Sequence, residues 1–212
     1  MRDIFKRILT ELKHHIAFTF FGACTGIAIM IIVIFGGFLS KVAPFSEDIF
    51  FILHPTHVFL SALVTTTLYL KYSKKNIWLA LIIGYTGSIG IATISDSIIP
   101  YIGELLLDLP HAEAHIGFIE EPIIVNIPAF IGILFAFWKG FTKFPHAGHV
   151  LISTWASLFH VIMAIGTSLN IIQIIGIFIF LFLAVWLPCC TSDIIYPLIF
   201  SNKKIIGQLN NK

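Results

Sequence analysis

The residues in this sequence that can do chemistry are concentrated in one polar stretch, residues 110–121, within a largely apolar chain. His111 and His115 are four residues apart, and on a short helix this spacing places both imidazoles on the same face. The stretch also contains three carboxylates, Glu113, Glu120 and Glu121. Imidazole and carboxylate side chains are typical ligands of transition metals, so the stretch predicts a metal site.

Further candidate ligands lie elsewhere in the chain. His54 and His57 flank Pro55, and Asp96 lies near the end of an apolar run. A carboxylate in such a run is costly unless it is paired, solvated or bound to a metal. We expect these residues to join the polar stretch in one site near the outer face of a membrane. The predicted metal ligands of this site are His54, His57, Asp96, His111, His115, Glu121 and His160.

A second, weaker metal site is predicted on the opposite side of the membrane. Its ligands would be His146, His149 and Asp193, near the adjacent Cys189 and Cys190. A helical wheel over residues 146–160 shows one polar stripe formed by His146, His149, Ser153, Ser157 and His160. A polar stripe that connects two ligand clusters is what a permeating cation needs.

The composition indicates which elements must position these residues. Hydrophobic residues make up 58% of the 212 residues, charged residues make up 11%, and the mean hydropathy is +0.96. These values are too apolar for a soluble domain of this size, so we predict an all-α, polytopic membrane helix bundle whose main partner is the lipid bilayer. The formal net charge is only +2, and the basic residues lie in short loops instead of one cluster. Both observations argue against nucleic acid as a partner. The three cysteines form no disulfide framework.

The apolar segments predict about six transmembrane helices, over residues 16–41, 46–72, 77–99, 122–141, 145–166 and 169–200. Ser46 is the expected N-cap of the second helix, and Pro55 is expected to bend or restart that helix. The third and fourth helices would be joined by an outer re-entrant or interfacial helical segment, in which Glu104 and Asp108 are solvated charges.

The basic residues predict the orientation of the bundle. They lie at both ends of the chain and in the loops after the second and fourth helices, so both termini are expected in the cytoplasm. The expected organisation is a cytoplasmic amphipathic lead-in, a single transmembrane domain and a short cytoplasmic tail, over residues 1–15, 16–202 and 203–212. The expected location is a prokaryotic cytoplasmic (inner) membrane.

These patterns favour transport of a divalent transition-metal cation, with zinc, iron or manganese as the metal. A membrane-embedded metalloenzyme acting on a lipid or another apolar substrate is the alternative, either as a hydrolase or as a di-iron-type oxygenase. Glu113 or Glu120 would then serve as the general base. A third hypothesis is a haem-binding electron carrier, because His146 and His160 lie 14 residues apart on one predicted helix. Homo-oligomers are compatible with all three.

Overall fold

The structure is a computed structural model that describes residues 2–73, 76–138, 143–191 and 195–200. The chain is 86% helical, and the described residues include no β-strand. The all-α class expected from the composition is therefore confirmed.

Six helical segments account for most of the chain. They are α1 (Arg2–Phe35), α2 (Leu39–Tyr72), α3 (Ile77–Thr93), α6 (Pro122–Trp138), α7 (Lys143–Ala164) and α8 (Ile171–Cys190). A π-helical turn, η1 (Ile94–Ile98), joins α3 directly to α4 (Ile99–Leu106). Two short helices, α5 (Gly117–Glu120) and α9 (Tyr196–Ile199), complete the described elements.

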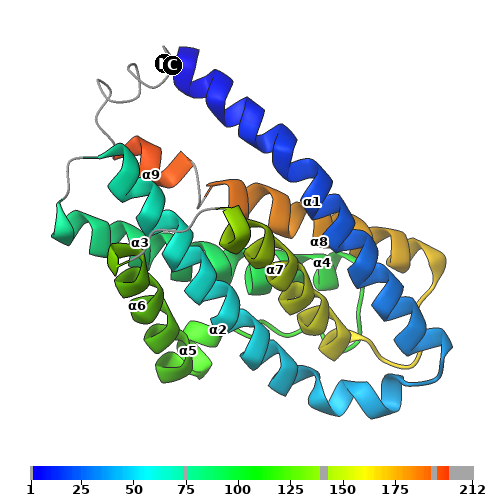
Figure 1. Cartoon of the computed structure of the whole chain (residues 1–212). Coiled ribbons are helices and arrows are strands. Elements are labelled where there is room, and N and C mark those ends of the chain that lie inside the picture. Colours follow the sequence, from blue (N-terminus) through cyan, green and yellow to red (C-terminus); the bar gives the residue numbers. More distant parts are fainter. Residues whose placement is uncertain (1, 74–75, 139–142, 192–194, 201–212) are drawn as a thin grey trace.

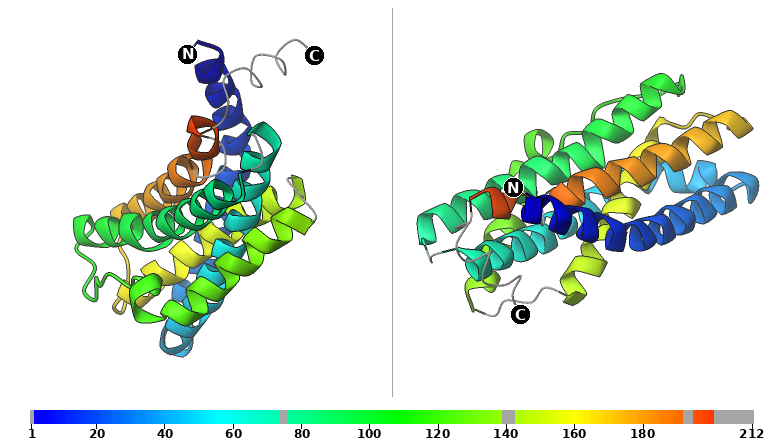
Figure 2. Two further views of the ribbon diagram at one scale, coloured as in Figure 1. Left: turned by 90° about the vertical axis from the view of Figure 1, so that its left-hand side faces the viewer. Right: turned by 90° about the horizontal axis from the view of Figure 1, so that it is seen from above.

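The helix α2 lies at the centre of the bundle. It packs against α3, α6 and α7, whereas α1 lies along α7 and α8 (Figure 1). Figure 2 shows from two further directions that the long helices run alongside one another. The α4 segment and η1 both contact α7 and α8, so the end of the third helical segment is enclosed by its neighbours.

The outer surface of the bundle is suited to lipid. Four segments are long and apolar enough to cross a membrane: Ile16–Phe35, Leu39–Lys71, Ile77–Leu106 and Ile171–Cys189. The remaining two expected spans correspond to the shorter apolar helices Pro122–Trp138 and Gly148–Ala164. Large apolar side chains cover the outside, and Trp78 and Trp138 are 77% and 78% exposed. Contiguous apolar surface of this kind is typical of proteins that contact membranes.

The second helix differs from the sequence prediction in two ways. It begins at Leu39, seven residues before the expected cap, and Ser46 lies inside it, donating from its hydroxyl to the carbonyl oxygen of Val42 at 3.1 Å. Pro55 does not restart the helix, because α2 continues through it to Tyr72. The consequence is that His54 and His57 lie near the middle of one continuous helix, α2.

The connection after the third helix is also different. Pro100 does not end the helical segment, because it occupies the first turn of α4, where a missing N–H group costs little. Helix α4 ends at Leu106, and Asp108 then has a positive φ of 50°. Residues 109–116 belong to no helix, so the expected short helix carrying His111 and His115 is absent. The expected lead-in is likewise continuous with the first span, since α1 begins at Arg2.

Candidate metal centre

One face of α7 carries a buried row of polar side chains. His149, Ser153, Ser157 and His160 are all 0–1% exposed, at the positions where the helical wheel predicted a polar stripe. The row faces η1 and α4, because these two elements supply most of its hydrogen-bond partners. The described part of the stripe is therefore an internal surface of the bundle.

Asp96, at the centre of η1, connects α2 to α7. Its Oδ2 atom accepts hydrogen bonds from Nδ1 of His54 at 2.9 Å and from Nδ1 of His57 at 2.7 Å. Its Oδ1 atom accepts from the Ser153 hydroxyl at 2.7 Å. Both histidines and Asp96 are buried, so both carboxylate oxygens are engaged away from water. The structure thus brings three of the predicted outer-site residues together, with the carboxylate between the two imidazoles.

The π-helical turn explains how this contact forms. Three consecutive residues, Ser95, Asp96 and Ser97, are fully buried in η1. A π-helical turn widens the helix and disturbs the regular backbone ladder. Here the carbonyl oxygen of Ser95 accepts a hydrogen bond from the Ser157 hydroxyl at 3.1 Å, and the Ser95 and Ser153 hydroxyls are 2.7 Å apart. Side chains of α7 therefore stabilise the turn that presents Asp96.

The hydrogen bonds to Asp96 determine the orientation of both imidazoles. An ionised carboxylate only accepts hydrogen bonds, so Nδ1 carries the proton in His54 and in His57. In the neutral imidazoles the lone pair is then on Nε2. This carboxylate–histidine arrangement is the one that commonly orients metal-binding histidines. In His54, Nε2 is buried without a hydrogen-bond partner and lies against Gly117. In His57, Nε2 faces the sulfur of Cys189 at 3.9 Å.

A buried group that can hold a metal ion is formed by His57, His149 and Cys189. One potential ligand atom from each residue lies within 4.8 Å of the other two. The rings of His57 and His149 are parallel to within 2°, with centroids 5.6 Å apart. The three residues come from α2, α7 and α8, so the group joins three long helices. It combines a residue expected in the outer site with two from the expected inner cluster, and the two predicted sites are therefore not separate at this point.

Glu104 and His160 form a second buried pair. Nδ1 of His160 donates to Oε1 of Glu104 at 2.7 Å, and Nε2 of His160 accepts from the backbone N–H of His115 at 3.3 Å. Glu104 is 1% exposed, so the prediction that it is a solvated surface charge is wrong. Both ring nitrogens of His160 are engaged in hydrogen bonds here, and its role as a metal ligand stays a prediction.

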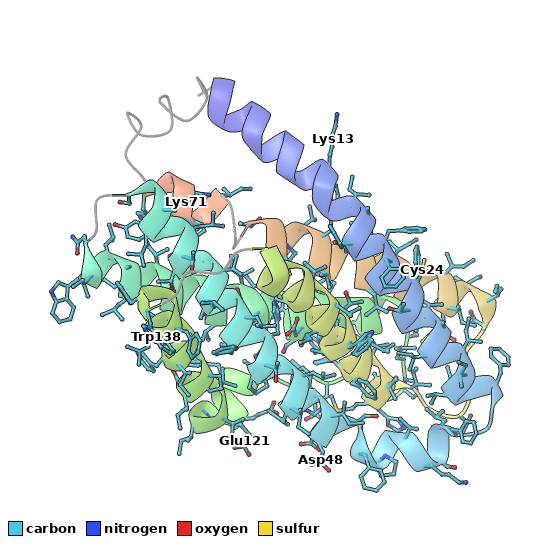
Figure 3. The ribbon with its side chains drawn as sticks, in the orientation of Figure 1. Lys13, Cys24, Asp48, Lys71, Glu121 and Trp138 are labelled. Atoms are coloured by element: carbon cyan, nitrogen blue, oxygen red, sulfur yellow. The ribbon has the colours of Figure 1, made fainter. Side chains whose placement is uncertain are left out.

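The predicted residues of the polar stretch lie at one end of the bundle. His115 is half-buried, and its Nδ1 atom is 3.5 Å from Oε2 of Glu120. Together with Glu47 of α2, these residues form an exposed group with metal-compatible spacing. Three other predicted residues, His111, Glu113 and Glu121, are exposed outside this group. Figure 3 shows Glu121 pointing away from the bundle, at the same end as Asp48 and opposite Lys13 and Lys71.

The side chain of His146 and the whole of Asp193 lie outside the described residues.

Three residues of these groups were missed or only partly recognised from the sequence. Glu104 follows Asp96 at a spacing of eight residues, with Pro100 midway, and this four-residue repeat marks a single helical face. Cys189 was recognised only as a neighbour of the weaker site, and Glu47 only as an acid near a helix start. Their proximity to histidines that are distant in the sequence has no local signal.

The electrostatics of the interior favour a bound cation. Among the described residues, the buried set includes Asp96 and Glu104 but no lysine or arginine. Buried charges require pairing, protonation or a metal ion. The contacts of His54 and His57 with Asp96 compensate its charge only if one of the imidazoles is protonated. A cation beside His57 would provide that compensation.

Comparison of the chain with protein-family models, with curated proteins and with solved structures gives no match. The arrangement of its own residues is therefore the basis for assigning a function.

Proposed function

We propose that the protein transports a divalent transition-metal cation across a membrane. The observation that carries this proposal is the buried group of His57, His149 and Cys189, which lies among long apolar helices. Structural zinc sites are usually closed by four protein ligands, whereas the three ligands found among the described residues leave a coordination position open. An open position allows a cation to be exchanged between ligands, as transport requires.

The buried row on α7 supplies a path between this group and one end of the bundle. Ser153 and Ser157 follow His149 along the helix, and His160 lies beside His115 of the exposed group. Polar side chains of this kind inside a membrane protein commonly mark an ion pathway. We propose that the exposed carboxylates attract the cation and that the buried group binds it in transit.

The proposed topology has six passes, with both termini in the cytoplasm. Lys13 and Lys71 lie at one end of the bundle, and Asp48 and Glu121 lie at the other end (Figure 3). This distribution supports the orientation that the positive-inside rule predicts. The shorter helices α6 and α7 would complete the six passes within the bundle.

The proposal is tested by metal uptake into proteoliposomes that contain the purified protein and an internal metal-sensitive dye. We expect His149→Ala to abolish zinc uptake, because it removes one of the three ligands that the described residues provide. His111→Ala is the matched control, since that side chain is exposed outside both groups. Uptake by His149→Ala at the rate of the unsubstituted protein would contradict the proposal.

A membrane-embedded metallohydrolase is the second candidate, because catalytic zinc sites also have three protein ligands and an open position. The general bases expected from the sequence do not favour it: Glu113 is exposed, and Glu120 contacts His115 and accepts from the backbone of Ile116. Neither belongs to the buried group. Metal binding without uptake, together with turnover of a lipid ester that His149→Ala abolishes, would support the enzyme instead.

A further inference from the structure

The donor atoms of the buried group narrow the choice of metal, if the proposed transport function holds. The group provides two imidazole nitrogens and one sulfur, and none of its three residues is a carboxylate. Imidazole suits zinc, copper, iron and nickel, and thiolate ligands favour zinc and other soft metals. Magnesium and manganese prefer oxygen ligands in octahedral geometry.

The carboxylate of Asp96, which contacts His57, does not change this donor set. Asp96 uses Oδ2 for His54 and His57 and uses Oδ1 for Ser153. Direct coordination by Asp96 would require these hydrogen bonds to break inside the bundle. Its role is that of a positioning residue, which holds the His57 ring with Nε2 toward Cys189.

The distance between the two best-defined donors is close to that in a tetrahedral zinc site. Zinc–nitrogen and zinc–sulfur bonds of about 2.0–2.1 Å and about 2.3 Å place the two ligand atoms roughly 3.6 Å apart. Nε2 of His57 and Sγ of Cys189 are 3.9 Å apart. A side-chain shift of a few tenths of an ångström brings both within bonding distance of one metal ion.

The charges of such a site also balance. A thiolate is formed when Cys189 binds the metal and its thiol proton is released, so one proton leaves for each cation bound. The two positive charges of the metal then meet one negative charge on the sulfur and one on Asp96. Balance of this kind matters in a buried site, because an uncompensated charge there is costly.

We infer that His57, His149 and Cys189 form a thiolate-containing site that takes zinc and its close analogue cadmium in preference to manganese or magnesium. The metal is divalent, Cys189 supplies the sulfur ligand, and the two histidines supply nitrogen ligands. No change of oxidation state is involved.

The test is titration of the purified, metal-free protein with cadmium chloride, followed by ultraviolet absorption. A cadmium–thiolate bond gives a ligand-to-metal charge-transfer band that cadmium bound only to nitrogen or oxygen does not give. We expect a band that saturates at one equivalent, disappears in Cys189→Ser and persists in Cys24→Ser, where an exposed cysteine of α1 is replaced. Added zinc should remove the band, and excess manganese should leave it unchanged.

X-ray absorption at the zinc edge of the unsubstituted protein provides a measurement that does not depend on a variant. One sulfur and two imidazoles around zinc would support the inference. A shell of nitrogen and oxygen alone, or a cadmium band that persists in Cys189→Ser, would overturn it.

The outcomes also separate this inference from the transport proposal. A cadmium–thiolate band in a protein that takes up no metal would disprove transport and leave the zinc-class site in place. Uptake of manganese by a protein that gives no such band would disprove the zinc-class site and leave transport in place.

Discussion

At the scale of single residues, Asp96 determines whether the buried group can form. Its carboxylate accepts from Nδ1 of His54 and of His57, and it also receives the Ser153 hydroxyl. One carboxylate therefore fixes two imidazoles of α2 against α7. If the ring of His57 turned, Nε2 would no longer face Cys189, and the sulfur and nitrogen ligands would not converge.

We expect Asp96→Asn to fold but to bind cadmium about 10- to 100-fold more weakly, the usual cost of losing a group that orients a metal-binding histidine. The amide keeps the size of the side chain but has only one acceptor oxygen. The charge-transfer band should still appear at saturating cadmium, because Cys189 remains a ligand. Cadmium titration followed by absorption measures both quantities.

Ser97→Ala is the matched control for this substitution. Ser97 is buried in the same π-helical turn, and its hydroxyl has no hydrogen-bond partner. Its removal should leave the cadmium affinity unchanged. Complete loss of the band in Asp96→Asn would show instead that Asp96 is a direct ligand.

At the scale of elements, the sequence predicted which residues lie close together in space more reliably than where each helix begins and ends. His54, His57 and Asp96 were expected in one group because polar residues in an apolar chain are tolerated only together. The π-helical turn could not be predicted, since a shift of this kind depends on tertiary contacts such as the hydrogen bond from Ser157 to Ser95. The third helix was predicted to end just before Pro100. Glu104 was therefore expected in an interfacial segment, whereas it is buried in the bundle.

The glycines of α3 are a second case in which the sequence predicted one part of the packing and not the other. Glycine occupies residues 84, 87 and 90, and this three-residue spacing predicts a packing seam on one face of the helix. A Cβ atom on Gly84 would collide with Thr66, and one on Gly87 would crowd Thr65, so these two pack against α2. Gly90 has open space around its missing Cβ. The spacing identified the face of the helix but not where the contact with α2 ends.

The contact between α2 and α6 depends on Gly132. A Cβ atom there would overlap the backbone carbonyl of Phe59 and press on Ala62. The backbone carbonyl, unlike a flexible side chain, cannot rotate away from the added methyl group. We therefore expect Gly132→Ala to destabilise the protein by about 1–3 kcal/mol, the usual cost of overpacking. Thermal unfolding in detergent, followed by circular dichroism, measures the effect.

Gly90→Ala is the control for the Gly132 substitution. Because space is open at this position and alanine has the higher helix propensity, the melting temperature should stay the same or rise. Equal melting temperatures for Gly132→Ala and the unsubstituted protein would mean that α2 and α6 are less tightly packed than the structure shows.

At the scale of the whole molecule, the protein is an apolar helix bundle with a set of polar side chains buried in its interior. Exposed apolar side chains, with Trp78 and Trp138 among the most exposed, surround a buried set that contains histidines and carboxylates. Tryptophan is enriched where membrane and water meet. Both tryptophans flank the loops that carry lysines, at the end that the charge distribution assigns to the cytoplasm.

The topology can be tested at two exposed positions, Lys13 before the first span and Glu113 in the connection between α4 and α5. The spans Ile16–Phe35, Leu39–Lys71 and Ile77–Leu106 separate them. Because three crossings are an odd number, the two positions must lie on opposite sides of the membrane. In a Cys24→Ser background, we expect a membrane-impermeant maleimide to label Glu113→Cys in intact cells and Lys13→Cys only after permeabilisation. The reverse pattern would invert the orientation while preserving three crossings. Labelling of both positions from the same side would show that one of these segments does not cross, and the exposed and buried groups could then no longer mark a route through the bilayer.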